Sequence, residues 1–135
     1  MRGIALLLAG LGLASCSTTA LQPTRSAQAE QDFQRLLAGK VAGPPVACLS
    51  TFRANDMVVI DENTVAFKRG HSEVYVNHIP GGCSNLGMSH YALVTRQQGT
   101  SLCRGDIAQV MDISNGMTVG SCSMGDFIPY KRIGA

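Results

Sequence analysis

Short runs of β-branched, aromatic and aliphatic residues alternate with turn sequences along most of the chain after Pro45. The run at 73–79 is rich in such residues, although its apolar and polar positions do not alternate regularly. A four-residue hairpin loop is expected at 97–100, between strands at 91–95 and 102–111. Strands spaced about ten residues apart predict an all-β fold, a small antiparallel barrel or a curled sheet of six or seven strands.

A helical pattern precedes these strands. Its apolar face consists of Phe33, Leu36 and Leu37, which recur at i, i+3 and i+4. The pattern predicts a short helix over 27–38, with Ser26 as its N-cap and Gly39 at its end. Three apolar residues are few for membrane insertion, so we expect this helix to pack on the β domain rather than to bind a membrane or a partner.

The N-terminus has the pattern of an export signal. Arg2 precedes an uncharged apolar run of eleven residues, 3–13, which is too short to span a bilayer and is typical of a signal peptide. We therefore assign 1–15 to a signal peptide and 16–26 to a flexible polar tether. The disulfide-bonded β domain is assigned to 41–135.

The motif Leu13-Ala14-Ser15-Cys16 resembles the lipobox of bacterial lipoproteins. Lipoprotein maturation needs a cysteine thiol to receive a diacylglyceryl group, with small residues just before it. The alternative is an ordinary cleavage site at 18–20. Ser17 rather than Asp follows Cys16, and the resemblance implies sorting to the outer membrane, facing the periplasm. Two or three acyl chains would make the anchor durable.

Charge and composition exclude some functions. Without 1–15 the chain has ten basic and nine acidic side chains, and no basic stripe suits nucleic acid as a partner. No later run approaches the roughly 18 apolar residues of a transmembrane helix. The chain has no Trp, four Phe and three Tyr. Its core is therefore small, and small exported domains usually add disulfides.

Four cysteines remain once Cys16 carries lipid: Cys48, Cys83, Cys103 and Cys122. An even number in a small exported domain predicts two disulfides. Three pairings are possible, and an up-and-down strand order favours Cys83–Cys122 with Cys48–Cys103. Successive cysteines lie 19 to 35 positions apart, whereas a zinc site uses close pairs, so we expect neither a metal nor another cofactor.

The histidines are the main candidates for chemistry. His78 and His90 flank one cysteine-containing loop, and together with Tyr91 they form the sharpest candidate binding site. Arg53 would join them at the mouth of a barrel. For His71, His78 and His90 alike, the simpler interpretation is that the side chain packs in a loop or lies on the surface. The sequence has no Gly-x-Ser-x-Gly elbow and no Gly-rich phosphate loop, so no catalytic residue is assigned.

Two short motifs have simple structural interpretations. Arg104-Gly105-Asp106 spells an adhesion tripeptide, but its expected place inside a strand favours a chance match. Asp61 and Glu62 are adjacent carboxylates, and we expect both to be solvated in a turn rather than paired for acid–base chemistry.

Six motifs follow one another in a distinctive order: ACLS at 47–50, VIDENTVAF at 59–67, VYVN at 74–77, CSNLG at 83–87, LCRGD at 102–106 and CSMGDFIP at 122–129. This order resembles a family of small proteobacterial exported proteins of unknown function with a cysteine-rich β domain. The motifs consist of cysteines, turn residues and strand cores, so the resemblance implies a shared fold and no particular activity.

The sequence therefore favours an envelope lipoprotein whose β domain is a non-enzymatic binding or structural module. Its expected partners are the membrane, through the lipid on Cys16, and a protein of the cell envelope. The alternative is a small-ligand-binding or enzymatic barrel with its site near His78, His90 and Tyr91. A deep pocket with convergent polar groups would favour that alternative.

Overall fold

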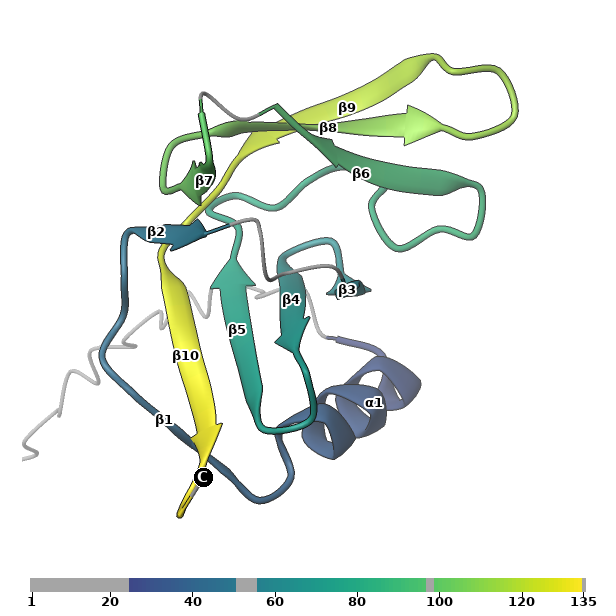
Figure 1. Cartoon of the computed structure of the whole chain (residues 1–135). Helices are drawn as coiled ribbons and strands as arrows, with labels where there is room; N and C mark the ends of the chain where they lie inside the picture. The colour runs from purple at the N-terminus through teal and green to yellow at the C-terminus, as the bar shows by residue number, and fades with distance from the viewer. Residues whose placement is uncertain (1–24, 51–55, 97–98, 135) are drawn as a thin grey trace, which may run out of the picture.

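The computed structural model describes residues 25–50, 56–96 and 99–134. Within these ranges the structure contains one helix and ten strands, and the strands form three antiparallel sheets (Figure 1). The elements are α1 (Ala27–Leu37), β1 (Lys40–Ala42), β2 (Cys48–Ser50), β3 (Asp56–Asp61), β4 (Thr64–Arg69), β5 (Glu73–His78), β6 (Tyr91–Thr95), β7 (Ser101–Cys103), β8 (Ile107–Asp112), β9 (Thr118–Ser123) and β10 (Phe127–Arg132).

The mostly β character is confirmed, but the predicted barrel is wrong. The largest sheet has the strand order β1-β10-β5-β4-β3, a second has the order β6-β8-β9, and β2 pairs with β7. In the described residues the two end strands of each larger sheet do not pair with each other, so neither sheet closes. Closure is not needed to bury the five-stranded sheet, because α1 covers one face and the other strands pack on the opposite face (Figure 1).

One run divides and one strand is missed, and both contribute to the excess of the described strands over the predicted six or seven. The run at 102–111 divides at Arg104-Gly105-Asp106, a turn in which Gly105 has a φ of 88°. Its first part, β7, pairs with β2, whereas β8 pairs with β6 and β9. The missed strand, β1, is only three residues long and pairs with the end of β10.

The predicted helix is confirmed over Ala27–Leu37. The Ser26 hydroxyl oxygen accepts a hydrogen bond from the Ala29 backbone N–H at 3.1 Å and so caps the first turn. Gly39 follows the helix with a φ of 71°, a conformation that glycine adopts without strain. Phe33 is buried against the sheet, so the helix packs on the β domain.

Both faces of the central strands β4 and β5 are buried. On one face, Ala66, Val74 and Val76 pack with Phe33 of α1 and Ile60 of β3. On the other face, the core contains Val65, Phe67, Tyr75, Leu93, Ala108 and Val110. A strand buried on both faces needs apolar residues at successive positions, which explains the irregular alternation of the run at 73–79.

The junction between β9 and β10 joins the two larger sheets, and it is held by Asn77. The Asn77 side chain is fully buried. Its Nδ2 donates to the carbonyl oxygen of Gly125 at 2.7 Å, and the Gly125 N–H donates to its Oδ1 at 2.9 Å. A Cβ at position 125 would lie 2.2 Å from the carbonyl oxygen of His78, so only glycine fits there. Phe127, two residues later, is also fully buried.

Two disulfides join the sheets and loops. Cys48–Cys103 links directly opposed residues of β2 and β7, and Cys83–Cys122 links the loop after β5 to β9. These are the pairs that the strand order favours. Each bridge stabilises a fold of this kind by about 2–4 kcal/mol. Disulfides form and persist in oxidising compartments, so the protein belongs outside the cytoplasm.

Replacing Asn77 by alanine should lower the free energy of unfolding by about 2–4 kcal/mol, because the N–H and carbonyl of Gly125 would lose their partners while buried. Urea unfolding of N77A and of the unmodified protein measures the difference. The control is N115A, since the Asn115 side chain bonds to residues near it in an exposed turn. Equal effects of the two substitutions would contradict the role given to Asn77.

Candidate functional site

A groove of about 680 Å³ is lined by residues of β1, β2, β4, β5 and β10 and by residues next to these strands. Its apolar lining consists of Val41, Ala42, Gly43, Pro44, Val46, Leu49, Pro129 and Ile133. We call it the β1–β10 groove. Alternation along β10 places Pro129 and Lys131 on the same face as the buried Phe127. Lys131 lies near the end of β10, where the strand is exposed, and its side chain is 63% exposed.

A row of charges crosses one end of this groove. Lys131, Glu73 and Arg69 are directly opposed on the neighbouring strands β10, β5 and β4. Lys131 Nζ lies 3.0 Å and Arg69 Nη1 lies 3.5 Å from the Glu73 carboxylate, and the Tyr75 hydroxyl donates to the same carboxylate at 2.8 Å. Two cations thus share one anion, and Arg132 adds a further positive charge at this end.

The charges of this row shift the pKa values of its members. Burial raises the pKa of Glu73, but hydrogen bonds from Lys131 and Tyr75 and the charges of Lys131 and Arg69 outweigh burial, so the pKa is lowered. The hydrogen bond and charge of Glu73 in turn raise the pKa of Lys131. At neutral pH, Glu73 is therefore an anion and Lys131 a cation, and the guanidinium of Arg69 gives the row a net positive charge.

Backbone hydrogen bonds and a disulfide hold the walls of the groove in place. Gly43 N–H donates to the Pro129 carbonyl oxygen at 2.7 Å, and Val46 N–H donates to the Phe127 carbonyl oxygen at 2.8 Å. A Cβ on Gly43 would lie 3.2 Å from the Pro129 ring, so this segment runs close against β10. On the opposite wall, Cys48 of β2 is held by its disulfide.

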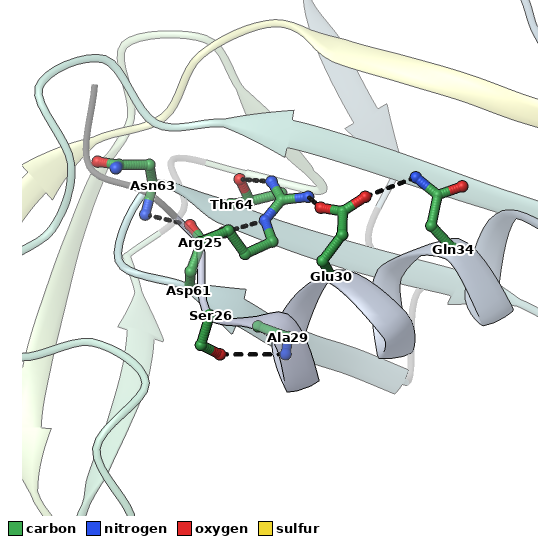
Figure 2. Close-up of polar contacts among 8 residues, drawn as sticks. All are labelled: Arg25, Ser26, Ala29, Glu30, Gln34, Asp61, Asn63 and Thr64. Carbon is green, nitrogen blue, oxygen red and sulfur yellow. Dashed lines mark hydrogen bonds and ion pairs between the residues drawn. The ribbon is translucent and has the colours of Figure 1, made fainter. Parts of the chain in front are cut away.

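A second polar assembly, the Arg25 cluster, joins the start of α1 to the β3–β4 hairpin (Figure 2). Arg25 Nε donates to the Asp61 carboxylate, Nη1 to Glu30 at 3.0 Å, and Nη2 to the Thr64 hydroxyl at 2.9 Å. The guanidinium carbon also lies 4.3 Å from the centroid of the Phe33 ring. The side chains of Arg25 and Asp61 are each 20% exposed. The expectation that Asp61 is solvated is therefore wrong, because the fold brings a cation to it.

A cavity of about 560 Å³ adjoins the Arg25 cluster, with exposed His78 at its rim. Partial burial lowers the pKa of His78, and the charge of Arg25 lowers it further, whereas Asp61 opposes both. One oxygen of Asp61 accepts from Arg25, and the other accepts from the Asn63 N–H at 2.7 Å. Both oxygens of Asp61 thus have partners, and the cluster fastens α1 to the sheet.

The three residues of the predicted histidine site have different surroundings. His78 lines the cavity beside Arg25, whereas His90 contacts Ser89 at 3.1 Å and the ring of Tyr91, with centroids 6.1 Å apart. Within residues 25–50, 56–96 and 99–134, no three His, Cys, Asp or Glu side chains gather as a metal site would require. Arg53 lies outside the described residues.

The adhesion-like tripeptide lies in a turn and not in a strand as expected. The backbone turns at Gly105, between β7 and β8. The Asp106 carboxylate accepts the Cys103 N–H at 2.7 Å, and Arg104 pairs with Asp126 at 3.0 Å. Both charged ends of the tripeptide thus hold the turn in place, which is a structural role.

Sequence reasoning missed the β1–β10 groove. The prolines at 44 and 45 indicate only a break in the helix, and the missed strand β1 forms one wall. One signal was available: Lys131 and Arg132 follow directly after an apolar strand. What the sequence does not show is that Arg69 lies beside them, because two strand pairings bring it there.

Replacing Arg25 by glutamine should lower the free energy of unfolding by about 1–3 kcal/mol, because Asp61 and Thr64 would lose a charged donor in a partly buried place. The matched control is R35Q on the same helix. The Arg35 side chain pairs with Asp32 but is 72% exposed, so its loss should cost at most about 0.5 kcal/mol. Urea unfolding at pH 7 compares the two, and equal costs would refute the assigned role.

Comparisons with known proteins give a family but no activity. A model of a family of unknown function, DUF6491, matches residues 1–124. The search of curated proteins and the search of solved structures each found no match. Of the described elements, no helix combines the length and the apolar character needed to cross a bilayer. Since the match spans most of the sequence, this chain belongs to the DUF6491 family of unknown function.

Proposed function

We propose that this protein is an exported, lipid-anchored binding module and that the β1–β10 groove holds an apolar ligand. The groove itself carries the proposal, because its volume of about 680 Å³ lies within the range of small-molecule sites, roughly 300–1,000 Å³. Val41 and Val46 remain 54% and 38% exposed along it. Apolar side chains gathered in an open groove are a common feature of binding surfaces.

The hydrogen bonds and the disulfide that hold the walls of the groove support binding. Its floor is the five-stranded sheet, its rim at residues 43–46 is hydrogen-bonded to β10, and β2 is tied to β7 by a disulfide. A ligand would therefore not have to order these walls when it enters. Sites formed in advance lose less free energy to ordering on binding, so a modest apolar contact suffices for measurable affinity.

Export and anchoring are the second part of the proposal. Two disulfides indicate an oxidising compartment, and the Cys16 motif would supply an anchor at the outer membrane. Residues 1–24, which contain this motif, lie outside the described residues. The β domain would then be displayed at the membrane surface, with an envelope protein or a small molecule as its partner.

A Cys16→Ser variant tests the anchor. It should move from the membrane fraction to the soluble fraction, because it lacks the thiol that receives the lipid. Its β domain should still fold, since both disulfides use other cysteines. Fractionation of cells and non-reducing gels measure the two outcomes. A variant that stays with the membrane, or that needs Cys16 in order to fold, would contradict the anchor.

A Val46→Asp variant tests the groove with the fluorescent apolar probe N-phenyl-1-naphthylamine. We expect the unmodified protein to enhance the fluorescence of the probe and V46D to bind it at least about fivefold more weakly, because a carboxylate would enter the apolar lining. The control is V94D, since Val94 is also 38% exposed but lies on β6, outside the groove. Thermal unfolding of both variants verifies folding. Equal loss in both, or no loss in V46D, would refute the groove as the binding site.

A further inference from the structure

Resting on this proposed function, we infer that the ligand of the β1–β10 groove is a free long-chain carboxylate, with its hydrocarbon tail in the groove and its carboxylate at Arg69 and Lys131. Both cations line the groove. Two features of the groove support this ligand: the positive charge of Arg69 and Lys131, and a lining made mostly of apolar residues.

The charged end is complementary to an anion. Glu73 is the acidic partner of both Arg69 and Lys131, and its side chain is only 15% exposed, so it lies beneath them. Lys131 is close to Glu73 at 3.0 Å, whereas the nearest nitrogen of Arg69 is 3.5 Å away and the guanidinium has other N–H groups to offer. Among the residues that the structure describes, Glu73 is the one carboxylate paired with these two cations, and a ligand carboxylate would give them a second anion.

The floor is complementary to a hydrocarbon. The Tyr75 hydroxyl donates to Glu73, the Gly43 N–H to Pro129 and the Val46 N–H to Phe127. Pro44 has no N–H. These three donors are not available to polar groups along a ligand, and polar groups that lose their hydration without gaining partners bind at a cost. An unbroken methylene chain has no such cost.

An extended peptide fits the groove less well. A peptide binds a sheet edge by adding a strand, which requires a row of free backbone groups. The edge strand β1 has only three residues before the Gly43-Pro44-Pro45 segment, and proline offers no donor to a new strand. The edge thus provides too short a row for strand addition.

Calorimetric titration of the unmodified protein with octanoate, decanoate and dodecanoate, each below its micelle concentration, tests the tail. Affinity should rise with length, by up to about fourfold for each methylene that becomes fully buried. Dodecanol and dodecyltrimethylammonium test the head group, and both should bind at least about fivefold more weakly than dodecanoate. Equal binding of dodecanol would overturn the carboxylate assignment yet leave an apolar groove. No binding of any of these compounds, or of the naphthylamine probe, would overturn the proposed function too.

Variants of the charged row separate recognition from loss of folding. R69Q should weaken dodecanoate about fivefold and leave dodecanol unchanged, whereas R35Q on α1, as control, should alter neither. E73Q should strengthen dodecanoate several-fold, because it frees both cations from their own anion, and a purely structural role of Glu73 predicts no such gain. Weaker dodecanoate binding by E73Q would refute the inference. Binding to phosphatidylglycerol vesicles without binding to monomeric dodecanoate would also refute the inference, because the ligand would then be a membrane surface and not a free carboxylate.

Discussion

The pair of hydrogen bonds between the Asn77 side chain and Gly125 is the constraint on which the rest of the fold depends. It holds the place where the chain leaves the three-stranded sheet and enters the five-stranded one. Because the Asn77 amide offers both a donor and an acceptor, it satisfies the two backbone groups of Gly125 inside the core. The register of β10 follows, with Phe127 opposite Asn77. That register then places Lys131 opposite Glu73, where the groove ends.

The two polar assemblies of this protein differ in how completely their charges are paired. In the Arg25 cluster, one cation has two carboxylates and a hydroxyl as partners, and these contacts attach the helix to the sheet. In the charged row, two cations share a single carboxylate, Glu73. Unequal pairing beside an apolar groove is the physical difference that makes the second assembly a candidate binding site and the first a structural one.

Local chemistry sufficed to predict several elements. The Ser26 cap, the Phe33 face and Gly39 define the helix through neighbouring residues alone. The strand run at 73–79 is visible because β-branched and aromatic residues cluster in it, and it corresponds to β5. The observed disulfides are the pairing that an up-and-down strand order favoured among three possibilities. The division of the run at 102–111 was missed, because its first part, β7, has only three residues and pairs with the distant strand β2.

The sequence by itself determined the helix, most of the strands, the presence of two disulfides and the motif at Cys16, because each depends on residue type and on spacing along the chain. Only the tertiary structure decided that the sheets stay open, that Asp61 meets Arg25, and that Arg69, Glu73 and Lys131 form one row. These features depend on strand pairing and on which face each layer covers. Strand pairing makes neighbours of residues about sixty positions apart, such as Glu73 and Lys131, and local sequence patterns do not indicate such pairs.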